Sequence, residues 1–262
     1  MKKSHRKRLI IIIVISAVLI SFAIALLIYS RTLAPIKPAS DTEAVKEKPV
    51  TPTTPVITPV ATPPAFDMAK YSTTDPASIW IITNKTHPLN PIDYKPADLV
   101  SVHGGTVSAQ MEPDLDNMIA AAKAQGVNLT LASSYRSYSY QVGLYNSYVA
   151  QSGQAAADTY SARAGYSEHQ TGLAIDFGGT TQPSCNISDC YKDTVEGKWL
   201  AANASTYGFL LRYTTEKQTV TGYISEPWHY RYVGSYLTTE MKARQVTTLE
   251  EFFNVSGGET YS

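Results

Sequence analysis

The chain has 262 residues, of which 44% are hydrophobic and 17% charged, and its formal net charge is zero. This length suits one good domain with attachments, or two small domains at most. Residues 1–48 hold nine Lys or Arg against three Asp or Glu, which leaves 13 against 19 in residues 49–262. The larger part is mildly acidic and offers no basic stripe, so we expect no nucleic-acid partner.

An uncharged apolar stretch lies near the N-terminus. Residues 9–29 read LIIIIVISAVLISFAIALLIY, and about 20 apolar residues are needed for a helix to cross a bilayer. The alternative is a cleaved signal peptide, but its apolar region usually spans about 7 to 15 residues. We therefore predict a transmembrane anchor at 9–29. Because positive charge stays on the cytoplasmic side, residues 1–8 form a basic cytoplasmic tail, and the rest of this single-pass cell-membrane protein is extracytoplasmic.

A segment biased toward Pro and Thr follows the predicted anchor. It covers residues 30–66 and ends in TPTTPVITPVATPPA, with no helical or alternating apolar period. Proline fixes the backbone and removes hydrogen-bond donors, so this segment should be an extended, semi-rigid linker. Residues 67–262 have a globular composition and are predicted to form one domain.

The domain shows mixed secondary-structure signals in chain order. Helices are predicted at 113–125, 138–151, 156–164, 194–206 and 238–254. Strands are predicted in VNLTLASSY, LAIDF, FLLRY and GYISEPWHYRYVG. Helices and strands do not alternate regularly, which indicates an α+β domain around a mostly antiparallel sheet.

Two cysteines lie close together in the loop PSCNISDC. Four residues separate Cys185 from Cys190, and an extracytoplasmic location would allow a local disulfide between them. Two free thiols are the alternative. No further cysteine pair is present to complete a cysteine-based zinc site.

Nucleophilic serine chemistry finds no support in the motifs. The sequence has no G-x-S-x-G, and its S-x-x-K, from Ser4 to Lys7, lies in the basic tail. Among the five histidines, His169 precedes Asp176 by seven residues, and His229 follows Glu226 by three. Two imidazoles and a carboxylate can hold zinc with one position left open.

Glu226 could supply a general base beside such a metal. In a regular strand, a spacing of three would put Glu226 and His229 on opposite faces. Pro227 between them indicates a bulge or an edge position, which can redirect a side chain. Strand alternation would also place Trp228 and Tyr230 away from His229, in the core.

Three strings together carry a family resemblance: SSYRSYSYQ, GYSEHQTGLAID and EPWHYRYVG. In this order and spacing, residues 115–234 resemble the zinc D-alanyl-D-alanine carboxypeptidases of the VanY type, which share a fold with the LD-carboxypeptidase LdcB and the Hedgehog signalling domain. The resemblance implies a Hedgehog/DD-peptidase-like domain with one zinc ion. It places the metal ligands at His169, Asp176 and His229 and the catalytic base at Glu226.

The resemblance also implies roles for neighbouring polar residues. Arg136 matches an arginine that binds substrate and stabilises the polarised carbonyl oxygen, which suits a guanidinium; a structural salt bridge is the alternative. Gln141 and Ser167 match positions that line the substrate cleft, although Gln141 could equally decorate a helix. Glu168 is expected to pack behind the ligands or to face solvent.

The implied function is removal of the terminal D-alanine from peptidoglycan stem peptides during cell-wall remodelling. Glu226 would deprotonate the attacking water and return the proton to the leaving amine. An LD-carboxypeptidase, an endopeptidase that cleaves crosslinks, and an inactive relative that binds wall peptides are the alternatives. The sequence does not decide among these.

Overall fold

The computed structural model describes residues 65–262. The predicted anchor at 9–29 and nearly all of the predicted linker lie outside the described residues. Within residues 65–262, no helix combines the length and apolar character that a membrane span requires. The first described residues already pack against the domain: the ring of Phe66 stacks on Trp80 and Tyr236 with centroid distances of 5.7 and 4.6 Å.

A four-stranded antiparallel sheet forms the centre of the domain, in the order β3-β4-β6-β5. The strands are β3 (Leu129–Ser133), β4 (Ala174–Gly179), β6 (His229–Tyr232) and β5 (Phe209–Leu211). Every residue of β4 and β6 is buried, as the inner position of these strands requires. The mixed fold confirms the predicted α+β domain around a mostly antiparallel sheet.

A second, two-stranded sheet was not predicted. It pairs β1 (Leu99–Val102) with β2 (Gly105–Ser108) in antiparallel register. Both turn residues, His103 and Gly104, have positive φ angles of 49° and 81°, the conformation of a tight hairpin turn. The histidine hides this signal, because Asn or Asp is the usual residue before glycine in such a turn.

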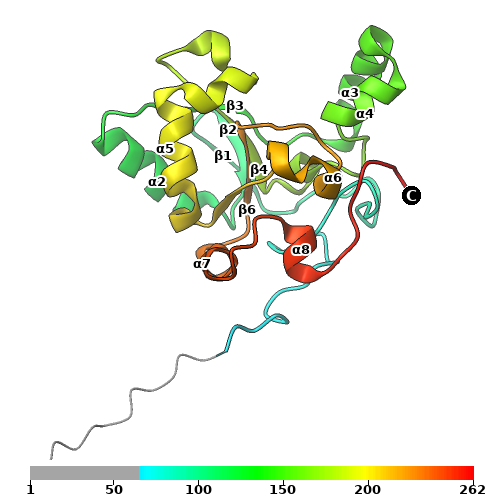
Figure 1. The fold of residues 1–262 in the computed structure, drawn as a ribbon, viewed down its shortest axis with the longest axis horizontal. Coiled ribbons are helices and arrows are strands. Elements are labelled where there is room, and N and C mark those ends of the chain that lie inside the picture. Colours follow the sequence, from blue (N-terminus) through cyan, green and yellow to red (C-terminus); the bar gives the residue numbers. More distant parts are fainter. Residues whose placement is uncertain (1–64) are drawn as a thin grey trace, which may run out of the picture. The chain divides into compact units, whose positions relative to one another are not determined.

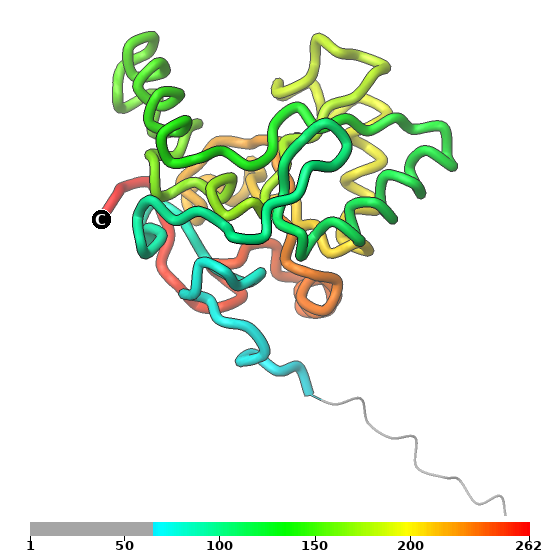
Figure 2. The backbone as a smooth tube through the Cα atoms, turned by 180° about the vertical axis from the view of Figure 1, so that it is seen from behind, coloured from blue at the N-terminus to red at the C-terminus, as the bar shows by residue number. Residues whose placement is uncertain are grey.

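Helices surround the central sheet on several sides (Figure 1). They are α2 (Glu112–Ala124), α3 (Tyr138–Ser152), α4 (Gln154–Tyr160), α5 (Val195–Asn203), α6 (Gln218–Thr221), α7 (Ser235–Arg244) and α8 (Leu249–Phe253). Both Figure 1 and the reverse view in Figure 2 show α3 and α4 as a hairpin that projects from the body of the domain, on the side opposite α2 and α5.

The predicted C-terminal helix at 238–254 is divided into two helices. Gln245 ends α7 in the left-handed conformation, with φ of 58°. The Thr248 hydroxyl then accepts a hydrogen bond from the Glu251 amide and caps α8, a common device at a helix start. It was not predicted from the sequence that Gln245 ends one helix and Thr248 begins another. The helix predicted at 156–164 occupies 154–160 instead.

Cys185 and Cys190 form a disulfide, which confirms the predicted local disulfide. The bond closes the short loop that carries Ile187.

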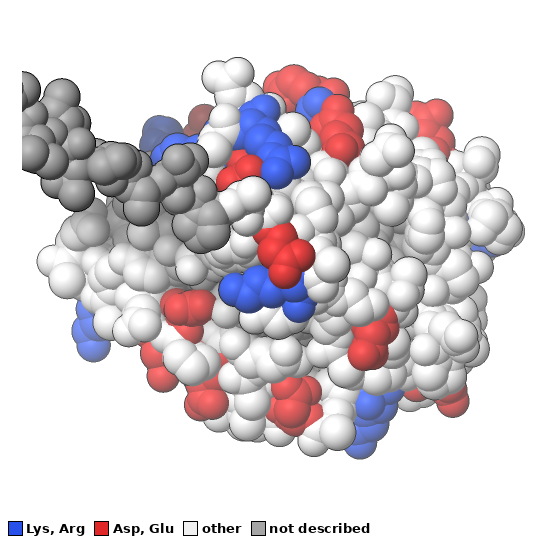
Figure 3. All heavy atoms as spheres, turned by 90° about the horizontal axis from the view of Figure 1, so that it is seen from below, with Lys and Arg blue, Asp and Glu red and all other residues white. Residues whose placement is uncertain are grey.

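The surface shows no separation of charge on the face in Figure 3, where Lys and Arg are interspersed with Asp and Glu among uncharged residues.

Candidate metal centre and cleft

The structure brings the three predicted metal ligands together. His169 lies in the short 3-10 turn η1 (Glu168–Thr171), Asp176 lies on β4, and His229 begins β6. Asp176 and His229 are direct cross-strand partners. One donor atom from each of the three side chains lies within 4.8 Å of the other two, and all three residues are buried.

Gly172 makes this convergence possible. It ends η1 in the left-handed conformation, with φ of 70°, which glycine adopts without strain. A Cβ atom there would meet the Ser108 nitrogen at 3.0 Å and a Leu99 methyl at 3.1 Å. The chain can therefore reverse from His169 into β4 against the β1–β2 hairpin. Gln170 secures the turn from behind, because its amide nitrogen donates to the carbonyls of Ile92 and Tyr94.

The donor atoms of His169 indicate that a cation fits this site. Its Nδ1 lies 2.7 Å from the Ser134 carbonyl oxygen, so Nδ1 carries the proton and Nε2 presents a lone pair. Nε2 is buried without a hydrogen-bond partner among the described residues, yet it lies 3.2 Å from Asp176 Oδ2. Two acceptors face one another here, and a metal ion between them would satisfy both. Imidazole nitrogen and carboxylate oxygen are usual zinc ligands.

The charges of the site shift the pKa values of the ligands. Burial lowers the pKa of His169 to about 4, and the nearby charge of Arg136 acts in the same direction. Burial also lowers the pKa of His229, but hydrogen bonds to the Asp176 and Glu168 carboxylates outweigh it and raise this pKa to about 9. Burial opposes ionisation of Asp176, yet the two histidines pull its pKa well below the usual value.

Glu226 reaches the centre from a turn. The amide of His229 donates to the Glu226 carbonyl at 3.0 Å, so Pro227 and Trp228 are the two central residues, and proline favours the first of these positions. The predicted bulge or edge strand at Pro227 is therefore wrong, because β6 begins only at His229. The turn brings Glu226 Oε2 to 3.7 Å from His229 Nδ1.

The environment of Glu226 favours its protonated form. Burial raises the pKa of Glu226 to about 8, with a further rise from Asp176, while His229 acts in the opposite direction. A carboxyl group whose pKa lies near neutrality can both accept and release a proton during a reaction. This property suits a general acid and base.

Arg136 follows β3 and lies beside the centre. Its amide donates to the His169 carbonyl at 3.2 Å, and its Nη2 lies 3.7 Å from Asp176 Oδ2. Its buried Nε has no hydrogen-bond partner within residues 65–262. The guanidinium therefore keeps donors free, unlike that of a closed structural salt bridge, and it lines the same cleft as the metal ligands.

The centre opens into a cleft of about 320 Å³. Gln141 and Ser167 both line it, as predicted. Gln141 is held in place because its Nε2 donates to the Ala162 carbonyl at 2.7 Å, while its Oε1 has no partner in the described region. These two residues leave polar atoms at the wall of the cleft.

Most of the remaining wall was not predicted. It consists of apolar and aromatic side chains, namely Tyr148, Tyr160, Ile187, Tyr213, Tyr223, Ile224 and Trp228. Trp228 was expected in the core; it is partly buried against the core and also lines the cleft, because it belongs to the turn before β6, where strand alternation does not apply. Tyr230, within β6, is buried as expected. The wall comes from separate elements, so no contiguous motif marks it.

Glu168 is fully enclosed and does not face solvent. Its Oε2 lies 3.0 Å from His229 Nε2, on the side of the ring opposite Asp176. Burial raises the pKa of Glu168, but the charges of Arg212 and Arg231 outweigh it and hold this pKa well below the usual value. The first of the two positions expected from sequence, behind the ligands, is therefore correct.

Comparison with known proteins decides the family. The family model for VanY, described as D-alanyl-D-alanine carboxypeptidase, matches residues 105–235, which include every site residue described above. The chain belongs to the VanY family. It is also 34% identical over 189 residues to the putative carboxypeptidase YodJ of Bacillus subtilis, covering 68% of each chain.

Two solved structures extend the likeness to the fold. The LdcB LD-carboxypeptidase superposes with a TM-score of 0.63 at 34% identity, over 70% of this chain and 89% of that one. A variant of the vancomycin-resistance D,D-pentapeptidase VanY, in complex with Zn(II), gives a TM-score of 0.57 at 31% identity, over 66% and 98%. These findings confirm the predicted VanY-type family.

Proposed function

We propose that this VanY-family protein is a zinc-dependent carboxypeptidase that removes the terminal D-alanine from peptidoglycan stem peptides. The observation that carries this proposal is the buried lone pair of His169 Nε2, which faces Asp176 and His229 beside Glu226 in an open cleft. The family description and the Zn(II) complex of a related D,D-pentapeptidase support the same function.

The residues of the centre divide the chemistry among them. His169, Asp176 and His229 would hold one zinc ion, which when bound would supply Lewis-acid polarisation and lower the pKa of water. Glu226 takes the proton from the attacking water and passes it to the leaving amine of D-alanine. Arg136 donates to the developing oxyanion or to the terminal carboxylate of the peptide.

The cleft walls position the stem peptide. Gln141 and Ser167 offer polar contacts to its backbone, and the tyrosines and isoleucines of the wall exclude water around the reacting bond. Release of D-alanine from a tetrapeptide is a second candidate function, because the chain resembles the LdcB LD-carboxypeptidase over 89% of that structure. The two activities differ in the substrate that fills the same cleft.

A direct assay separates these functions. Purified protein with bound zinc should release D-alanine from a pentapeptide stem that ends in D-alanyl-D-alanine, and a chelator should abolish the release until zinc is restored. Release from a tetrapeptide alone would establish the LD-carboxypeptidase instead. Full activity in the presence of the chelator, or no release from either stem, would contradict the proposal.

We propose further that the domain acts outside the cell, tethered to the membrane through residues 9–29. The uncharged apolar sequence of this segment and the basic residues before it support this location, as does the Cys185–Cys190 disulfide, since such bonds persist in oxidising compartments. Protease added to intact protoplasts should digest the domain, and complete protection would contradict the location.

A further inference from the structure

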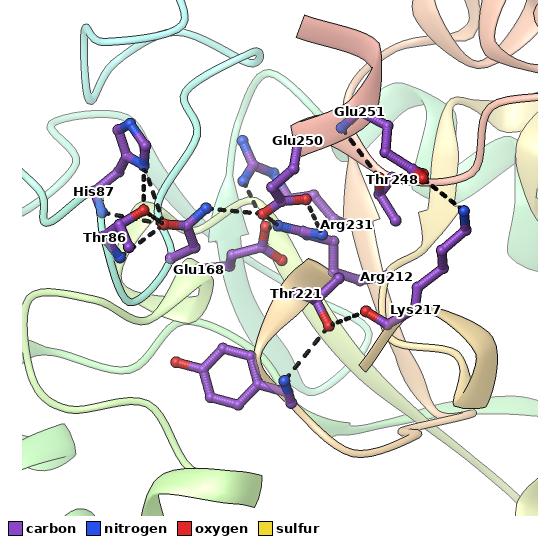
Figure 4. Close-up of polar contacts among 12 residues, drawn as sticks. Thr86, His87, Glu168, Arg212, Lys217, Thr221, Arg231, Thr248, Glu250 and Glu251 are labelled. Atoms are coloured by element: carbon purple, nitrogen blue, oxygen red, sulfur yellow. Dashed lines mark hydrogen bonds and ion pairs between the residues drawn. The ribbon is translucent and has the colours of Figure 1, made fainter. Parts of the chain in front are cut away.

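A chain of buried charged residues runs from the metal centre to helix α8. Glu168 Oε1 accepts hydrogen bonds from Arg212 Nε at 2.8 Å and from Arg231 Nη1 at 3.3 Å. Arg212 then donates from both terminal nitrogens to the two oxygens of Glu250, at 2.9 and 2.6 Å. Figure 4 shows these four side chains, contributed by η1, β6, α8 and the segment after β5, pointing toward one another. All four are at most 2% exposed.

A network of buried charges contributes little net stability to a core. Each buried charge loses its hydration, and replacement of buried ion pairs by apolar residues often leaves stability unchanged or improves it. Here two arginines and two glutamates balance one another, and Asn84 donates a further hydrogen bond to Glu250 at 2.9 Å. At its other end the network contacts the Nε2 atom of His229, which needs a hydrogen-bond partner that apolar residues could not provide.

The direction of each hydrogen bond follows from the chemistry of the side chains. Arginine only donates, so Glu168 Oε1 is an acceptor from both guanidinium groups. Oε2 of the same carboxylate faces His229 Nε2 at 3.0 Å, and it can only accept there as well. His229 must therefore carry a proton on Nε2, which leaves Nδ1, on the Asp176 side of the ring, as the atom available to a metal.

We propose that Glu168 is a positioning residue that fixes His229 in its metal-binding tautomer, and that Arg212, Arg231 and Glu250 hold Glu168 in place for this task. The inference rests on the proposed zinc site. Metal-bound histidines commonly donate their other N–H to a carboxylate, which fixes the ring and its tautomer. In this chain the carboxylate is adjacent in sequence to another ligand, His169, and it is held by Arg212 and Arg231, the first of which pairs with Glu250 of α8.

Glu168→Gln is the decisive substitution. The amide has one acceptor and one donor group, so it cannot accept from His229 and from the arginines together. If its NH₂ group faces His229 Nε2, the ring must move its proton to Nδ1 and lose metal affinity. If the NH₂ group faces Arg212 and Arg231, donors oppose one another. Either arrangement weakens the site while the size of the side chain is kept.

The test measures zinc binding and the state of the histidine, neither of which depends on peptide hydrolysis. Competition with a chromophoric chelator should show a zinc Kd raised about 10- to 100-fold in Glu168→Gln, the usual effect of removing such a partner. In the zinc-loaded wild type, ¹H–¹⁵N NMR should show the Nε2 proton of His229 shifted downfield by the carboxylate. Glu168→Gln should lose this downfield shift.

Two further variants keep the proposal testable. Glu168→Asp retains the charge between the arginines but withdraws the carboxylate from His229, so it should also weaken zinc binding even if Glu168→Gln fails to fold. Glu250→Gln should weaken it less. The matched control is Glu251→Gln. Glu251 is the neighbouring glutamate of α8, and it accepts a 2.7 Å hydrogen bond from Lys217, which is not part of the network (Figure 4). This substitution should leave the Kd unchanged.

A native zinc Kd, together with a His229 Nε2 proton that keeps its wild-type downfield position in folded Glu168→Gln or Glu168→Asp, would overturn the role of Glu168. Failure of the proposed function would look different: the wild type would bind zinc, with the predicted differences among variants, yet release no D-alanine. Circular dichroism and thermal unfolding of the zinc-free proteins identify any variant whose weaker binding reflects unfolding.

Discussion

Glu226→Gln should abolish turnover while the protein still binds zinc. The amide keeps the shape of the side chain but cannot accept the proton of the attacking water, a step that contributes about 10²- to 10⁴-fold to rates. The three predicted ligands are untouched, and Glu226 approaches His229 Nδ1 only to 3.7 Å. Zinc content by elemental analysis and D-alanine release, measured on the same sample, check the two halves of this expectation.

The same substitution has a second expected effect in the zinc-free protein. The pKa of Glu226 is raised from 4.5 to about 8, so the folded state binds more protons than the unfolded state between these values. The contribution of Glu226 to wild-type stability should therefore fall as pH rises through this window. Glutamine does not ionise, so Glu226→Gln should remove this contribution and be the more stable protein at pH 8, as chemical denaturation would show.

Glu216→Gln provides the control, because Glu216 is an exposed glutamate in the turn before α6. It should retain wild-type turnover and pH dependence. Wild-type activity in Glu226→Gln would remove Glu226 from the mechanism. Loss of zinc together with activity would instead make Glu226 part of the metal site.

Asp176→Asn should lose both zinc and activity. Asp176 contacts three other residues of the centre. Its oxygens lie 3.2 Å from His169 Nε2, 3.0 Å from His229 Nδ1 and 3.7 Å from Arg136 Nη2. Removal of its charge deletes an anionic ligand and leaves Arg136 without its neighbouring carboxylate. Loss of a residue that only hydrogen-bonds to a metal ligand already costs about 10- to 100-fold in metal affinity. We therefore expect the loss of a ligand itself to raise the zinc Kd by more than about 100-fold.

Chelator competition measures this change, with Asp116→Asn as the matched control. Asp116 also pairs with a histidine, since its Oδ1 lies 2.6 Å from His103 Nε2, but both side chains are exposed. Asp116→Asn should leave zinc binding unchanged. Tight zinc binding by folded Asp176→Asn would show that the metal lies elsewhere or needs only the two histidines.

The sequence alone determined the chemical parts of the site. His169 and Asp176 are close in the chain, joined by a turn with Gly172 and an apolar strand, so short-range rules sufficed to place both. His229 and Glu226 could be added because zinc chemistry restricts the ligand types and the three strings resembled one family. Helices 113–125 and 138–151 were also predicted nearly to their ends, since their boundaries depend on local signals.

Only the tertiary structure decided how these parts meet. Pro227 fits an edge or bulged strand as well as a turn, and the turn at Pro227 and Trp228 becomes clear only where β6 pairs with β4. The Glu168 network needs Arg212, Arg231 and Glu250 from three separate segments, and a buried charge in a sequence looks like an exposed one. Pairing of distant strands and compensation of buried charge depend on the packed chain, so residue type and spacing could not reveal them.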